Sequence, residues 1–152
     1  MIAGESDERT RDVHGRVALD RLIPSDVREI EPIVEQVARE CRVLALPPRQ
    51  CALNVPVALT EALSNAILRG NGGVRDKHVR VRAVVSDTAL VLEVADEGKG
   101  FDLDACTIDP TSPDNLERED GRGLFLMRSL MDRVERYEDD ARNVVRLTLN
   151  RL

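Results

Sequence analysis

The sequence predicts an α/β protein of the two-layer sandwich class, with helices on one face of a mixed, mostly antiparallel sheet. Strand-like alternation opens the chain, helical spacing of apolar residues follows, and paired alternating segments indicate hairpins in the middle and at the end. This order of elements is typical of helices packed against one side of a sheet. With 152 residues, the chain is long enough to bury a core of ordinary size.

Periodicity and helix-end signals predict the elements of the first half. Residues 17–23 alternate and predict the opening strand, and Ser25 is the expected N-cap of a helix that ends before a pair of prolines. Pro32 falls in the early turns of this helix, so its first turn starts later or bends there. Residues 54–69 predict a second helix that is capped by Asn54.

The second half begins with a glycine-rich stretch, residues 70–73, which is expected to end the second helix. Residues 78–94 predict an antiparallel hairpin. Residues 102–120 predict a long polar loop, a kind of segment that is usually functional or mobile. A short helix over 123–131 and a last pair of strands over 133–149 complete the domain.

Composition and charge exclude several classes of protein. A net charge of −6 and an aromatic content of 2% argue against nucleic acid as a direct partner, because a basic face and stacking platforms are lacking. No apolar run reaches the roughly 18–20 residues of a membrane helix, so we expect a cytoplasmic protein without a membrane partner. The 3 cysteines form no CxxC pair and predict reduced thiols, and no cluster predicts zinc. Residues 1–14 are expected to form a flexible tail, and residues 15–152 a single domain.

Glu61 and Asn65 are four residues apart on a predicted helix and therefore project from the same face. A carboxylate and an amide oxygen are suited to Mg²⁺, water or a hydroxyl group. The alternative is a solvated pair on the outer face of the helix, and the pair alone does not decide between the two.

Asp96 ends a strongly apolar strand and is followed by Gly98 and Gly100. A carboxylate at this point can accept a hydrogen bond from an exocyclic amine such as that of adenine. The glycines remove side chains that would block a planar ring. The alternative is an ordinary turn, since this composition is typical of turns.

Gly121 and Gly123 precede an apolar helix, and a helix N-terminus presents free N–H groups to phosphate oxygens. Arg122 and Lys99 are candidates for phosphate contacts, although exposed solubilising charge explains them equally well. The P-loop pattern is absent, and the glycines around Lys99 do not match the dinucleotide fingerprint.

Three segments in this order resemble a known family. EALSNAI (61–67), VADEGKGF (94–101) and GRGLFLMRSLMDRV (121–134) look like the N, G1 and G2 boxes of the Bergerat-fold ATPases of the GHKL superfamily. Within it they most resemble the bacterial anti-sigma factor serine/threonine-protein kinases. The resemblance covers nearly the whole chain after about residue 15.

The resemblance implies ATP and Mg²⁺ as cofactors and gives roles to the matching positions. Glu61 would be the catalytic residue that polarises the attacking hydroxyl, and Asn65 would bind Mg²⁺. Asp96 would read the adenine amine, and residues 102–120 would form a lid. The further residues implied to contact or shape the ATP site are Gly98, Gly100, Arg118, Gly121, Arg122, Gly123 and Thr148.

The resemblance also implies a function. The chain would phosphorylate a small anti-sigma-factor antagonist, sequester a sigma factor, and form a homodimer. A non-catalytic nucleotide-binding module that holds a protein partner is the alternative, and an adaptor with an empty pocket is a third class. Arg69 stands where relatives often have histidine, a change that would alter the rim of the pocket.

Overall fold

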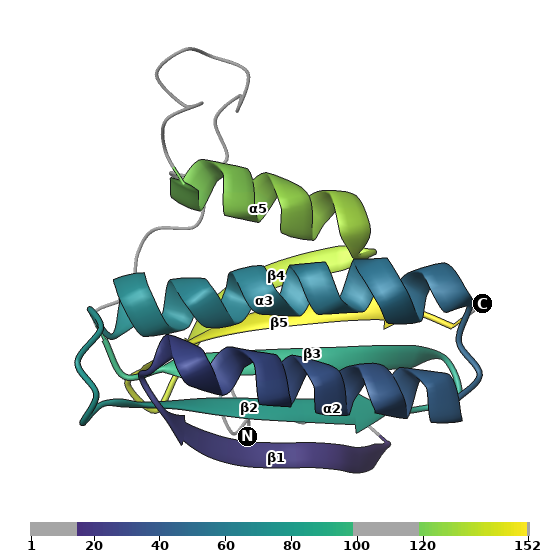
Figure 1. Cartoon of the computed structure of the whole chain (residues 1–152), viewed down its shortest axis with the longest axis horizontal. Coiled ribbons are helices and arrows are strands. Elements are labelled where there is room, and N and C mark those ends of the chain that lie inside the picture. The colour runs from purple at the N-terminus through teal and green to yellow at the C-terminus, as the bar shows by residue number, and fades with distance from the viewer. Residues whose placement is uncertain (1–14, 99–118, 152) are drawn as a thin grey trace, which may run out of the picture.

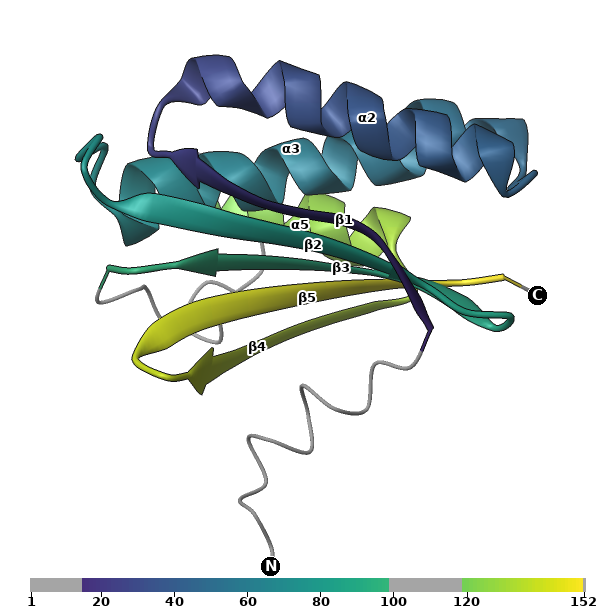
Figure 2. The ribbon, with the colours of Figure 1, turned by 90° about the horizontal axis from the view of Figure 1, so that it is seen from below.

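The computed structural model describes residues 15–98 and 119–151, which form one sheet and one layer of helices (Figure 1). The five strands lie in the order β1-β2-β3-β5-β4. Figure 2 shows α2, α3 and α5 together on one side of this sheet. The strands are β1 (Arg16–Pro24), β2 (His78–Val85), β3 (Ala89–Asp96), β4 (Arg133–Asp139) and β5 (Arg142–Asn150). The two-layer prediction is confirmed, with the predicted order of strands and helices.

All four ladders between the described strands are antiparallel, so the predicted mixed character of the sheet is not found among them. The central ladder joins β3 to β5 rather than to β4, its neighbour in sequence. Leu90, Leu92 and Val94 of β3 face the helices and belong to the main core. Leu147 of β5 lies opposite Leu92 and extends the same apolar surface. Burial of this shared apolar face explains why the two strands pair.

The first helix begins later than Ser25 and has a different cap. A short 3-10 turn, η1 (Val27–Glu29), precedes α2 (Ile30–Val43), in agreement with the delay predicted from Pro32. The N-cap of this turn is Asp26, whose carboxylate accepts a hydrogen bond from Arg28 N at 2.9 Å. The N-cap of α2 itself is Glu29, which makes no side-chain capping bond. Ser25 instead donates its hydroxyl to the carbonyl of Lys77 at 2.6 Å, which ties the end of β1 to the start of β2.

The second helix is a continuous run from Gln50 to Gly70 in which α3 (Val55–Asn65) lies between two π-turns, η2 (Gln50–Asn54) and η3 (Ala66–Gly70). The run starts earlier than predicted, so Asn54 is helical and makes no capping bond. Its Nδ2 donates to the carbonyl of Leu130 at 2.7 Å, at the end of α5 (Glu119–Leu130).

This run is also the one described helix long and apolar enough to cross a membrane, contrary to the expectation from composition. Half of its most apolar window is buried inside the protein. Leu59, Leu63 and Ile67 lie in the core between the sheet and the other helices, so its apolar character serves packing. Cys41 and Cys51 are buried free thiols in the same core, and Cys106 lies outside the described residues.

Candidate functional site

The predicted N and G2 segments meet where α3 passes α5. Glu61 and Asn65 are separated by one turn of α3, with their Cβ atoms about 6 Å apart, and both face Gly123 of α5. A Cβ atom placed on Gly123 would lie 2.9 Å from Glu61 Oε2 and 3.5 Å from Asn65 Nδ2. A side chain at residue 123 would therefore have to push the Glu61 carboxylate aside, and glycine avoids this contact.

Asn65 carries a buried polar atom of special interest at this contact. The residue is buried, and its Nδ2 atom has no hydrogen-bond partner among the residues that the structure describes. Buried polar groups are nearly always bonded, and an unpaired one calls for an explanation such as a ligand. Rotation of the amide by 180° exchanges its nitrogen and oxygen, so this position can present either a donor or an acceptor.

Asp96 lies at the end of β3 on the helix-facing side and is 4% exposed. The π-turn η3 ends beside it, closed by the bond from Asn71 N to the carbonyl of Ala66 at 2.8 Å. A Cβ atom on Gly70 would overlap the Asp96 carboxylate, and one on Gly98 would overlap the carbonyl oxygen of Gly70. The two glycines thus allow the end of the helix to contact the turn after β3.

The carboxylate of Asp96 has only neutral hydrogen-bond partners among the described residues. Its Oδ1 atom accepts from Gly98 N at 3.0 Å and from Asn143 Nδ2 at 3.2 Å. Burial raises the pKa of Asp96 above its usual value, and these two hydrogen bonds only partly oppose the shift. A buried acceptor with a raised pKa, at the edge of a packed turn, is the kind of group that recognises a ligand donor.

Asn143 is the residue of this cluster that sequence reasoning missed. It lies directly opposite Asp96 in the β3–β5 ladder and is buried. Its Nδ2 atom also donates to the carbonyl of Gly98 at 2.7 Å, and its Oδ1 atom accepts from Arg136 at 2.9 Å. No local motif marks this asparagine, because only the pairing of β5 with β3 brings it to Asp96.

Thr148 is not brought to this cluster. It pairs with Val91, five positions along β3 from Asp96, which corresponds to about 17 Å of strand. Its neighbours Leu147 and Leu149 belong to the main core, so Thr148 points to the face of the sheet without helices.

The G2 glycines lie inside α5 rather than ahead of it. The helix begins at Glu119, four residues before the predicted start, so Gly121 and Gly123 occupy its first turns. Arg122 lies in the same turns, but its side chain is not among those that the structure describes. Gly100, Arg118 and the proposed lid over 102–120 lie outside the described residues, except for the first helical residues 119 and 120.

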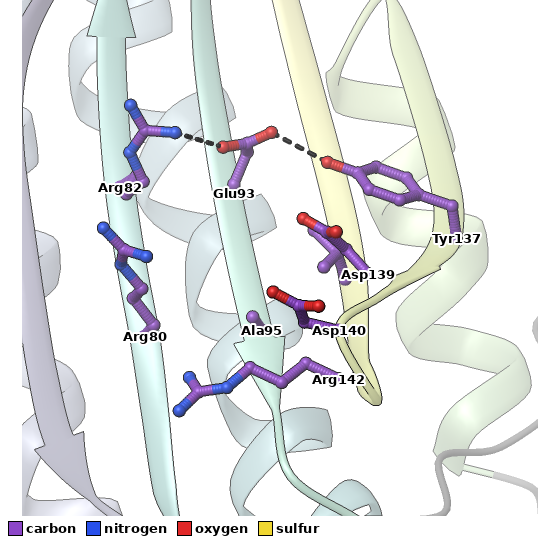
Figure 3. A pocket seen from close by; sticks show the side chains of 9 residues that line it. Arg80, Arg82, Glu93, Ala95, Tyr137, Asp139, Asp140 and Arg142 are labelled. Atoms are coloured by element: carbon purple, nitrogen blue, oxygen red, sulfur yellow. Dashed lines mark hydrogen bonds and ion pairs between the residues drawn. The ribbon is translucent and has the colours of Figure 1, made fainter. Parts of the chain in front are cut away.

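A separate pocket of about 260 Å³ lies on the opposite face of the sheet (Figure 3). Its floor contains Ala95 and Val144, and its walls include Arg80, Arg82 and Glu93. None of the predicted site residues lines it. The two faces of the sheet therefore carry two distinct polar clusters.

The residues beside α3 fit a nucleotide with its metal. Asp96 offers a buried acceptor, and the unpaired Asn65 amide next to Glu61 offers hard ligand atoms. No group of three or more His, Cys, Asp or Glu side chains among the described residues could hold a metal. Asn65, with Glu61 beside it, would hold Mg²⁺, an ion that usually takes few protein ligands together with water and phosphate oxygens.

Comparison with known proteins agrees with this arrangement. The family described as "Histidine kinase-like ATPase domain" matches residues 23–149. The anti-sigma F factor of Clostridium acetobutylicum is 39% identical over 87 residues, which are 54% of this chain and 57% of that protein. The serine-protein kinase RsbW of Listeria monocytogenes is 30% identical over 97 residues, which are 60% of this chain and 62% of that protein. The chain thus covers less than two thirds of the length of these two relatives.

A solved structure shows the same fold at low identity. A chain in the crystal structure of the SiaB–SiaC complex from Pseudomonas aeruginosa superposes with a TM-score of 0.68 and 13% identity, covering 94% of this chain and 95% of that one. The family match spans α2, α3, α5 and the strands from β2 to β5 up to Leu149, and it includes the last two residues of β1. The chain therefore belongs to the histidine kinase-like ATPase domain family and, within it, to the anti-sigma factor kinases of the GHKL superfamily.

Proposed function

We propose that the chain is an ATP-dependent serine/threonine-protein kinase and anti-sigma factor. It phosphorylates a small antagonist protein and sequesters a sigma factor. The observation that carries the proposal is the contact of Glu61 and Asn65 of α3 with Gly123 of α5, on a helical run whose end at Gly70 lies against Asp96. The names of the relatives, an anti-sigma F factor and a serine-protein kinase, support the choice of substrate class.

The residues would divide the work of binding and positioning. Asp96, with Asn143 beside it, would accept the hydrogen bond of the adenine amine inside a site that water reaches poorly. Asn65 would hold Mg²⁺, which when bound with ATP spans the phosphates and neutralises their charge. Glu61 would orient the attacking hydroxyl and accept its proton. Phosphoryl transfer requires little more than such positioning and charge neutralisation.

The product of this reaction would act as a switch between partners. A phosphoserine or phosphothreonine adds about −1.5 to −2 charges to the antagonist at neutral pH. This chain carries a net charge of −6, so a phosphorylated antagonist would be repelled by acidic parts of its surface. Release of the antagonist would leave the kinase available to the sigma factor.

Replacement of Glu61 tests the catalytic part of the proposal. Glu61→Gln should lower phosphoryl transfer by about 10²–10⁴-fold, the usual effect of a general base, and should leave ATP affinity nearly unchanged. Transfer is measured with γ-labelled ATP and candidate antagonist proteins, and affinity by calorimetry. Glu35→Gln, at an exposed position of α2, is the matched control and should behave as wild type.

The same assay separates the alternative function. A nucleotide-responsive module that holds its partner without modifying it would bind ATP and the antagonist but transfer no label. Equal transfer by wild type and Glu61→Gln would remove Glu61 from the mechanism. Absence of any ATP-dependent change in thermal stability would instead support the adaptor class.

A further inference from the structure

Asn71 occupies a junction between four segments, directly after the π-turn that ends at Gly70. The residue is 1% exposed, and both polar atoms of its side chain are hydrogen-bonded. Its Oδ1 atom accepts from Glu97 N at 2.8 Å. Its Nδ2 atom donates to Ser25 Oγ at 2.8 Å and to the carbonyl of His78 at 3.1 Å. The Asn71 side chain thus joins the end of η3 to three other segments. These are the residue that follows β1, the first residue of β2, and the turn after β3.

The bond to Glu97 is the one that reaches the candidate site. Glu97 lies between Asp96, the proposed adenine acceptor, and Gly98, which packs against Gly70. Its carboxylate is held as well, because Oε2 accepts from His78 N. Fixing the Glu97 N–H fixes the peptide plane that follows Asp96. The direction of the Asp96 carboxylate and the contact between Gly98 and Gly70 both depend on that plane.

We propose that Asn71 is a positioning residue for the adenine end of the ATP site, an inference that rests on the function proposed above. Asn71 contacts neither the Asp96 carboxylate nor Asn143 through any described hydrogen bond, so it acts through the backbone of Glu97. Neutral amides are well suited to this place, because the side chain must donate on one edge and accept on the other. A hydrophobic residue would leave the Glu97 N–H and the His78 carbonyl with fewer partners in a buried region.

Ser25 provides the matched control for this proposal. Ser25→Ala removes a hydrogen-bond partner of Asn71 and the bond to Lys77, but leaves the bond from Glu97 to Asn71 in place. Both Asn71→Ala and Ser25→Ala should lower thermal stability, because both lose buried hydrogen bonds. Only Asn71→Ala should release the turn that follows Asp96.

The test combines nucleotide affinity with amide hydrogen exchange. Asn71→Ala should weaken ATP and ADP binding by about 10-fold or more and raise the KM for ATP with a smaller change in kcat. Ser25→Ala should stay within about 2-fold of wild type. In the free protein, the Glu97 amide should be protected in wild type and in Ser25→Ala, and should exchange rapidly in Asn71→Ala. If Asn71→Ala does not fold, Asn71→Ser takes its place and should show the same changes.

Two outcomes would overturn the inference. One is a folded Asn71 variant with wild-type affinity for ATP, and the other is a Glu97 amide that exchanges rapidly in wild type. Failure of the proposed function gives a different result, since wild type itself would then bind no adenine nucleotide while the Glu97 amide stayed protected.

Discussion

Two buried carboxylates of β3, three residues apart, have opposite surroundings. Glu93 points to the face without helices and is 6% exposed, with an ion pair to Arg146 at 3.0 Å and hydrogen bonds from Tyr137 and Arg82. Asp96 points to the helices, is 4% exposed, and receives bonds from neutral groups. Glu93 contacts a guanidinium directly, whereas Asp96 makes no ion pair among the described residues and feels the charges of Arg136 and Lys77 only as smaller effects than its burial.

The difference separates a structural group from a ligand-binding one. Glu93 belongs to a row that crosses the sheet with alternating sign, from Asp20 through Arg82 and Glu93 to Arg146 and Glu135. Such opposite-charge neighbours stabilise a sheet and give register to its strands. Burial of Asp96 instead raises its pKa and so disfavours its ionised form, and a buried group of this kind is typical of a functional site. Substitutions at Glu93 and at Asp96 should therefore have different effects, the first on stability and the second on nucleotide binding.

The largest expected effect is on stability, at Glu93. Glu93→Gln removes the ion pair between Glu93 and the buried Arg146 guanidinium and should lower the free energy of unfolding by about 3–5 kcal/mol. Urea denaturation measures this loss. Asp20→Asn, in an exposed pair with Arg80 whose side chains are 38% and 50% exposed, should cost no more than about 1 kcal/mol. Similar losses in both variants would show that the Glu93 network is not specially stabilising.

The next effect is on nucleotide affinity, at Asp96. Asp96→Asn keeps an oxygen acceptor but removes the charge, and should weaken ATP binding by about 1.5–3 kcal/mol, the usual worth of a hydrogen bond to a charged group. Calorimetry at neutral pH measures the change, with Asp20→Asn as the control on the other face. Equal ATP affinity in Asp96→Asn and wild type would contradict the assignment of this carboxylate.

The smallest effect is a gain in stability in the same variant, and it depends on pH. The pKa of Asp96 in the folded state is raised above its ordinary value of 3.8 by burial, so the folded protein retains this proton more firmly than the unfolded chain. The Asp96 contribution to stability is therefore complete below pH 3.8 and falls as pH rises from there through the higher pKa of the folded state. Asp96→Asn should be more stable than wild type at pH 7, and its advantage should shrink as pH is lowered toward 3.8. A variant less stable than wild type at pH 7 would contradict this sign.

Local patterns predicted what depends on neighbours in sequence. The spacing of Glu61 and Asn65 placed them on one helical face, and the alternation of β2 and β3 predicted their hairpin. The resemblance of three short segments led to the family. These predictions needed no knowledge of how distant strands pair.

What the sequence did not predict depends on long-range register and on space. The β3–β5 ladder places Asn143 beside Asp96 and sends Thr148 to the other face, and a shift of one residue would reverse both. The stretch 70–73 was expected only to end a helix, and within it Gly72 and Gly73 have the left-handed backbone expected there. Gly70 instead leaves room for the Asp96 carboxylate, a need that is visible only in three dimensions.

A titration of the isotopically labelled protein with Mg²⁺ and a non-hydrolysable ATP analogue, followed by amide chemical shifts, tests the central claim most directly. We expect saturable shifts at Asn65, Gly70 and Gly98 around the helix-facing cluster, and none at Tyr137 or Arg146 on the open face. Shifts confined to the open face, or no saturable shifts at millimolar nucleotide, would contradict the claim that the ATP site lies between α3 and the end of β3.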